Sequence, residues 1–208
     1  MSNKLIPEDK EGKNTDLESS VEAENTTTAR DIFETACSHL LDPNNWHSLS
    51  GLGTAAFKLV RTGQEDAEGP AREGDYIRVN IPGPGLNTGD GYDWVRVELI
   101  EESRGDEQAE QIMGMKVRTC SNPNNDDADT AHFFKEGASS SFLITQNGTR
   151  VTASYHGRNE KINNNTEKIA DNIRNTAVAL GAIAGLSELQ WSKLIKGLLQ
   201  EGKTAESK

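Results

Sequence analysis

The sequence predicts an α+β fold: a curved, antiparallel sheet of about six strands, packed by an N-terminal helix and a C-terminal helical hairpin. Two observations predict this fold class. Several segments between residues 54 and 157 alternate apolar and polar side chains, whereas segments near both ends repeat apolar side chains at helical spacing. The links between most neighbouring strand segments are short, which favours antiparallel pairing.

The first predicted element is an amphipathic helix that begins near Thr28. In TARDIFETACSHLLDP the apolar side chains recur at helical spacing, Thr28 and Asp31 occupy capping-box positions, and Pro43 follows as a stop. Residues 1–28 hold few apolar side chains and an excess of carboxylates, so we expect a disordered acidic tail there. Residues 29–201 are expected to form a single α+β domain, and residues 202–208 a second disordered tail.

The strand predictions rest on alternation and on turn residues. Asn147 and Gly148 suit a two-residue hairpin turn, and Gly114 indicates a bulge or a close contact within its strand. The glycine-rich loop PGPGLNTGDGY is interpreted as a connection between two strands. The predicted strand segments are 54–61, 75–81, 93–102, 111–119 and the two arms of the hairpin within 139–157.

Two helices are predicted at the C-terminal end. Asn164 with Glu167 opens the first, which Gly185 ends, and Ser187 with Gln190 opens the second, whose apolar stripe includes Trp191. This order of elements resembles curved-sheet folds in which a terminal helix packs across an antiparallel sheet, a likeness of architecture that names no family. The structural alternative is a small closed β-barrel at residues 54–120 with helices added.

The composition excludes several classes of partner. A net charge of −11 opposes binding to nucleic acid or to anionic lipid. No apolar run reaches the ~18 residues of a membrane span, so we expect a cytoplasmic protein without a membrane partner. Cys37 and Cys120 lack CxxC spacing and are predicted to be buried thiols, and no cofactor is expected.

Neither polar loop predicts a strong anion or metal site. The loop PGPGLNTGDG is not a phosphate cradle, because Asp90 and Asp93 would repel phosphate and its two prolines lack N–H donors. Calcium candidates are Asp90 and Asp93 in this loop. Asp127 and Asp129 are further candidates in a second polar loop, at residues 120–138. Thr130 stands where an EF-hand loop requires glycine, so no metal site is predicted.

The leading functional hypothesis comes from the positions of the cations. If the apolar alternates face the helices, the opposite sheet face receives the predicted ligand-binding residues, with Arg78 opposite Arg96 and Tyr76 opposite Glu98. This predicts a non-enzymatic module that binds an anionic, carboxylate-bearing small molecule or an acidic protein segment. The alternative is a solvated face whose arginines pair with Glu98, Asp75 or the acidic tail. The predicted binding residues are Arg78, Trp94, Arg96, Arg118 and Arg158.

Two other classes of function stay open. A small-molecule enzyme would use His156 as acid or base in a cavity of the sheet, with Glu160 to orient it and His132 as a further candidate. No GxSxG or HExxH motif accompanies them. An oligomeric structural component would bury the Trp191 stripe of the C-terminal helices against another copy.

Overall fold

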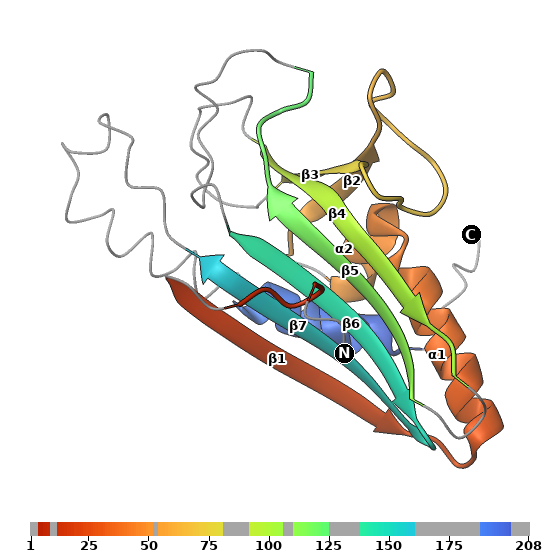
Figure 1. The fold of residues 1–208 in the computed structure, drawn as a ribbon. Coiled ribbons are helices and arrows are strands. Elements are labelled where there is room, and N and C mark those ends of the chain that lie inside the picture. Colours follow the sequence, from red (N-terminus) through yellow and green to blue (C-terminus); the bar gives the residue numbers. More distant parts are fainter. Residues whose placement is uncertain are drawn as a thin grey trace.

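Seven strands form one curved antiparallel sheet in the computed structural model, which describes residues 4–8, 12–51, 54–80, 92–105, 110–124, 138–160 and 188–200 (Figure 1). The order across the sheet is β1-β7-β6-β5-β4-β3-β2, with β1 and β2 at opposite edges. The predicted α+β fold is confirmed, and the alternative of a small barrel is wrong, because its strands belong to this single sheet. The strands are β1 (Lys13–Glu22), β2 (Ala56–Val60), β3 (Tyr76–Asn80), β4 (Asp93–Ser103), β5 (Gln111–Thr119), β6 (Ser139–Asn147) and β7 (Arg150–Glu160).

Strand β1 corrects the prediction that residues 1–28 form a disordered tail. It pairs with β7 along nearly its whole length, from Lys13 opposite Glu160 to Glu22 opposite Arg150. Leu17 and Val21 pack against the core. Pairing with β7 provides partners for backbone N–H and C=O groups, so a segment with few apolar side chains is ordered by its ladder.

The helices start at different residues from those predicted. Helix α1 (Thr26–Leu40) is capped by Asn25 rather than Thr28, because the Asn25 side chain accepts a hydrogen bond from the Thr28 N–H at 2.9 Å. The short helices η1 (Pro43–Asn45) and α2 (Trp46–Ser50) follow α1 and were not predicted. A further helix spans 188–198, while the helix predicted from Asn164 to Gly185 and the tail at 202–208 lie outside the described residues.

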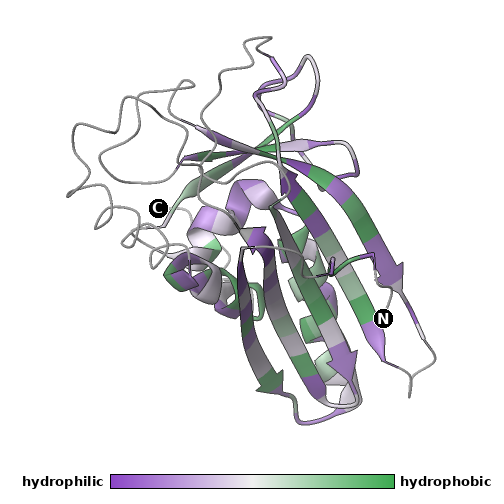
Figure 2. Ribbon diagram, turned by 60° about the vertical axis from the view of Figure 1, so that its left-hand side comes forward, coloured by the Kyte–Doolittle hydropathy of each residue, from purple (hydrophilic) through white to green (hydrophobic). Residues whose placement is uncertain are grey.

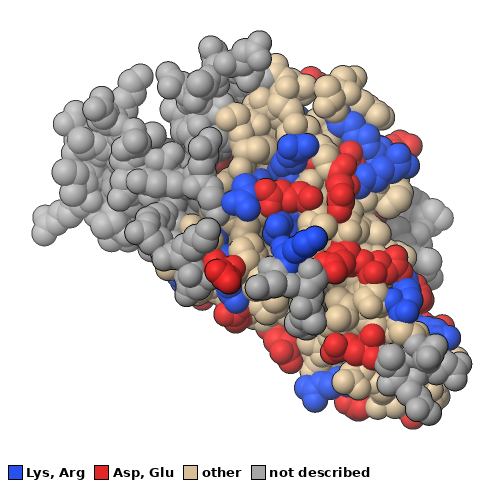
Figure 3. Space-filling view, viewed as in Figure 1, with Lys and Arg blue, Asp and Glu red and all other residues tan. Residues whose placement is uncertain are grey.

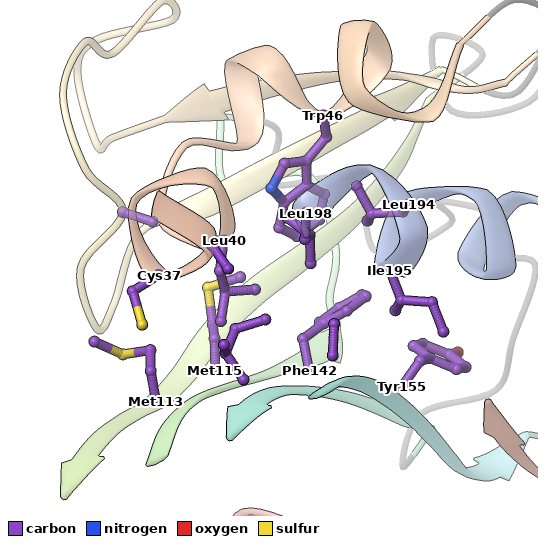
Figure 4. Packing of buried hydrophobic residues seen from close by; sticks show 14 of the residues in the cluster. Cys37, Leu40, Trp46, Met113, Met115, Phe142, Tyr155, Leu194, Ile195 and Leu198 are labelled. Atoms are coloured by element: carbon purple, nitrogen blue, oxygen red, sulfur yellow. The ribbon is translucent and has the colours of Figure 1, made fainter. Parts of the chain in front are cut away.

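The core lies between one face of the sheet and the helices, and we call this the inner face (Figure 1). Figure 2 shows the alternating hydrophobic and hydrophilic bands along the strands that produce it. Aromatic rings dominate its centre. Trp46 and Phe142 lie 5.2 Å apart between ring centroids (Figure 4), and the Trp191 ring stacks on that of Tyr155 at 5.2 Å. Trp46 of α2 is 2% exposed.

Helix 188–198 directs its apolar stripe at the chain's own sheet. Leu194, Ile195 and Leu198 are buried in the core (Figure 4), and Trp191 packs against it. The stripe that was predicted to bury against another copy is therefore used within the chain. Within the described parts of the chain, none of the helices combines the length and apolarity needed to cross a bilayer.

Candidate binding site on the outer sheet face

The predicted cations lie on the face of the sheet that turns away from α1 and helix 188–198, which we call the outer face. Figure 3 shows that lysine and arginine side chains on this face are interspersed with aspartate and glutamate. The acidic chain has therefore not formed an uninterrupted cationic surface. The question becomes which arginines already have a carboxylate partner.

A bulge in β4 neutralises two of these cations. The register between β4 and β5 shifts between Val97 and Leu99, and the residue between them is Glu98. Its carboxylate binds the Arg118 guanidinium and lies 3.3 Å from the Lys116 Nζ. Burial alone would raise the pKa of Glu98, but hydrogen bonds and charge from Arg118 and Lys116 outweigh it and hold the pKa below its usual range.

An aspartate on strand β1 pairs with two further side chains of the outer face, Arg158 and His156. The Asp16 Oδ1 lies 2.7 Å from the Arg158 Nη2 and 2.6 Å from the His156 Nδ1. Burial opposes ionisation of Asp16, but Arg158 and His156 outweigh that effect and lower its pKa. The alternative of a solvated, paired face is therefore right for Arg118 and Arg158, with the acid for Arg158 coming from the segment predicted to be a tail.

Asp75, the other predicted acidic partner, is used elsewhere. Its carboxylate accepts two hydrogen bonds from the Arg61 Nε at 3.2 Å and one from the Arg72 N–H at 2.9 Å. Arg61 also donates to the carbonyls of Glu68 and Pro70. This ion pair braces the connection from β2 to β3.

The predicted meeting of Arg78 with Arg96 is wrong. Arg78 lies opposite Trp94, and Arg96 lies opposite Tyr76 on one side and Arg118 on the other. The register differs by two residues from the predicted one, and a two-residue shift leaves every side chain on the same face. Alternation alone therefore could not distinguish the two registers across so long a loop.

Arg78 instead lines a cavity of about 340 Å³, which we call the Arg78 pocket. Its guanidinium carbon lies 4.7 Å from the centroid of the Tyr92 ring, the geometry of a cation–π contact. Among the described residues, no carboxylate lies within ion-pair distance of Arg78. The residues that line the pocket are Val60, Glu65, Arg78, Tyr92, Trp94, Asn122 and Asn124.

Three strands and two following turns build the pocket. The Cys120 N–H donates to the Trp94 carbonyl at 3.0 Å, so the chain leaving β5 continues beside the start of β4. Asn124 then folds back, its N–H donating to the Asn122 side chain at 2.9 Å. Trp94 is 4% exposed, and within the described residues its Nε1 has no hydrogen-bond partner. An unmatched buried donor is unusual in a folded protein.

His156 belongs to a different group of side chains. Its Nδ1 contacts Asp16, and its Nε2 lies 3.1 Å from the hydroxyl of Ser154, which stands two residues earlier on β7. Asp16 therefore takes the orienting place that the sequence gave to Glu160, whose side chain is not described; His132 also lies outside the described residues. None of Asp16, Ser154 and His156 lines the Arg78 pocket.

The metal and thiol predictions have separate outcomes. Asp93 is the first residue of β4, whereas Asp90, Asp127 and Asp129 lie outside the described residues. In the described part of the chain, no group of three or more His, Cys, Asp or Glu side chains could hold a metal ion. Burial raises the pKa of the Cys37 thiol to about 12 and that of Cys120 to about 11, so both are protonated near neutral pH.

Several residues at these sites were missed by the sequence interpretation. Tyr92 and Ser154 carried a usable signal, because each stands two residues before a predicted site residue and therefore shares its face. Asn122 and Asn124 follow a strand in an irregular segment, where no periodicity indicates direction. Asp16 was covered only by the alternative in which the acidic tail pairs with the arginines; nothing singled it out, since its role depends on the pairing of β1 with β7.

Comparison with known proteins does not assign a family. No family model matches the chain, and no curated protein sequence matches it. Among solved structures it is similar to protein Ms6760 from Mycobacterium smegmatis, with 14% identity, coverage of 89% of this chain and 90% of that one, and a TM-score of 0.38. It is also similar to a norcoclaurine synthase from Thalictrum flavum in complex with a transition-state analogue (15% identity, 86% and 94% coverage, TM-score 0.37). A third similar structure is the ZhuI aromatase/cyclase from Streptomyces sp. R1128 (11% identity, 87% and 94% coverage, TM-score 0.37). Likenesses at these scores carry no argument about ligand or activity.

Proposed function

We propose that this protein is a non-enzymatic binding module that takes a small carboxylate-bearing ligand in the Arg78 pocket. The observation that carries the proposal is the position of Arg78: it lines a cavity, rests on Tyr92, and has no ion-pair partner among the described residues. Arginine binds carboxylates through two parallel N–H···O hydrogen bonds, and the cation–π contact fixes the guanidinium in place before a ligand arrives.

The lining of the pocket narrows the chemistry of the ligand. A volume of about 340 Å³ lies near the lower end of the range for small-molecule sites, so a compact ligand is favoured. The Tyr92 and Trp94 rings suit a flat or aromatic group next to the carboxylate. Glu65 and the two asparagines add polar groups, so a ligand that also carries a hydrogen-bond donor would match more of the lining.

The test is a binding screen with a matched pair of variants. Calorimetry would compare a panel of small aromatic and aliphatic carboxylates, their amides, and a short oligoglutamate peptide. Arg78→Gln is expected to weaken carboxylate binding at least about tenfold, because a charge-assisted hydrogen bond contributes ~1.5–3 kcal/mol. Arg150→Gln is the control, since Arg150 lies on the far part of β7 with its guanidinium on Ser20.

Three outcomes would count against the proposal. Equal affinity for carboxylates and their amides would show that the charge of the ligand does not contribute to binding. Unchanged affinity of the Arg78→Gln variant would show that the ligand does not bind at Arg78. Preference for the oligoglutamate over every small carboxylate would replace the small ligand with an acidic protein segment.

A second candidate function rests on the chain Asp16–His156–Ser154. Ser154 stands in the position of a nucleophile, and His156 in that of the base that would accept its proton. Asp16 stands in the position of the carboxylate that orients the base. The proposed activity is nucleophilic attack by Ser154 on a small activated ester. This candidate ranks second because none of the three residues lines the Arg78 pocket.

Labelling with a fluorophosphonate probe tests this second candidate. The Ser154 oxygen would bond to phosphorus as fluoride leaves, and the label should be found on Ser154 by mass spectrometry. His156→Ala should reduce the labelling rate by about 10²-fold or more, the usual size of a general-base contribution. Thr152→Ala, which removes another hydroxyl from the outer face of β7, should leave it unchanged. Absence of label on Ser154 would end this candidate.

A further inference from the structure

The N-terminal segment 4–8 lies across the outer face of the sheet. Figure 1 shows it crossing the strands on the side away from the helices. Leu5 is 4% exposed, although it belongs to a short segment without regular secondary structure. A leucine buried from a segment without regular secondary structure, on the face opposite the core, indicates a specific place to receive it.

That place is a pit formed by a missing side chain. A Cβ atom at Gly114 of β5 would lie 2.5 Å from the Leu5 Cδ1 and 2.8 Å from its Cδ2, closer than such atoms can approach. The close contact that the sequence indicated at Gly114 is therefore with Leu5. Leu143 stands directly opposite Gly114 on β6 and is 1% exposed, so an apolar side chain lies beside the pit on the outer face.

The backbone of the segment is held as well. The Lys116 Nζ donates to the carbonyl of Lys4 at 3.1 Å, and the Ser141 hydroxyl donates to the carbonyl of Leu5 at 2.5 Å. Ser141 is fully buried, so its hydroxyl depends on this contact for an acceptor from outside its strand. One apolar side chain and two successive carbonyls are thus recognised together.

We infer that this pit is a binding site for an extended, leucine-bearing peptide segment of a partner protein, occupied in cis by Leu5. Recognition of backbone carbonyls together with one side chain is how extended peptides are bound, and it requires little of the remaining sequence. The described cis contact is only five residues long and has no regular secondary structure, so opening it costs little. Its tether supplies an effective concentration near the millimolar range, so a partner segment with further contacts can displace it.

The first test uses the full-length chain with Leu5→Asp, which removes the cis occupant and leaves the pit intact. The probe is a synthetic peptide of residues 1–12, titrated to about 2 mM, the scale of the tethered concentration, while backbone amide signals are followed by NMR. We expect saturable shifts at Gly114, Ser141 and Leu143. The wild-type chain, with its pit occupied, should require at least about tenfold more peptide.

Two matched controls sharpen this test. Adding Gly114→Ala to the Leu5→Asp chain fills the pit and should abolish the shifts, whereas adding Thr145→Ala, also on the outer face of β6, should not. A peptide that carries the same Leu5→Asp change should not bind. Absence of saturable shifts, or equal shifts with the control peptide or with Gly114→Ala, would overturn the inference.

A measurement on the otherwise unaltered chain covers the case in which Leu5→Asp fails to fold. Gly114→Ala alone should raise hydrogen exchange of residues 4–8 by about tenfold or more while the protection of β5 and β6 stays the same. An excess of the peptide of residues 1–12 should raise the hydrogen exchange of residues 4–8 in the wild-type protein in the same way. Unchanged exchange in both experiments would show that Leu5 does not occupy an exchangeable site.

Discussion

The two faces of the sheet are organised by different rules. The inner face is a continuous apolar surface under α1 and helix 188–198, and its members were predictable from alternation within each strand. On the outer face, Glu98 reaches Arg118 through a bulge, Asp16 reaches Arg158 from an unpredicted strand, and Leu5 docks from the N-terminal segment. Alternation within a single strand predicts which side chains are buried. Which charged side chains pair depends on the register between strands and on the topology of the sheet.

The largest expected effect is on the inner face. Phe142→Ala removes a fully buried ring that contacts Trp46, Tyr155 and Trp191, and should lower the free energy of unfolding by about 3–5 kcal/mol. Urea denaturation followed by circular dichroism measures this. Thr145→Ala, on the outer face of the same strand, is the control and should change it by less than ~0.5 kcal/mol. Similar losses for the two variants would remove the distinction between the faces.

Two glycines provide a second contrast of intermediate size. A Cβ at Gly197 would overlap the backbone carbonyl of Leu49 in α2, which cannot move without disturbing the helix layer. Gly197→Ala should therefore destabilise by about 2 kcal/mol net, even though alanine favours a helix by ~1 kcal/mol. Gly114→Ala should cost less, about 1 kcal/mol or below, because it undocks the Leu5 side chain but meets no backbone atom and removes a glycine from a strand. Chemical denaturation of both variants would check the order, and a larger loss for Gly114→Ala would reverse it.

The smallest effect concerns the charges. The folded-state pKa of Glu98 lies below its ordinary value of 4.5, so its stabilisation is present above about pH 4.5 and is lost as the pH falls through the folded value. Glu98→Gln should cost about 0.5–1 kcal/mol at pH 7, a modest amount for a pair near the surface. The difference from wild type should shrink as the pH falls below 4.5 and should disappear once Glu98 is protonated in the folded state. Glu18→Gln, an exposed carboxyl on β1, is the control; a gap between wild type and Glu98→Gln that persists at low pH would refute this account.

The sequence predicted the fold better than the site, for reasons visible in particular residues. Strands β2 to β7 were found because Ile77, Val79 and their counterparts alternate over several residues. Strand β1 was missed because its apolar positions include only Leu17 and Val21, and its order depends on β7. Arg78 and Trp94 were placed on the correct face, but their direct pairing required a register that a two-residue shift leaves undetermined.

The three tryptophans occupy surroundings different enough to act as separate optical probes. Trp46 and Trp191 are packed among the rings of the core, whereas Trp94 lines the Arg78 pocket. Fluorescence from Trp94 should therefore respond to occupancy of the pocket, and emission from the other two should follow unfolding. A Trp94→Phe variant would lack the emission of Trp94 and so separate the two signals. Fluorescence could then distinguish a molecule that fills the pocket from one that only stabilises the fold.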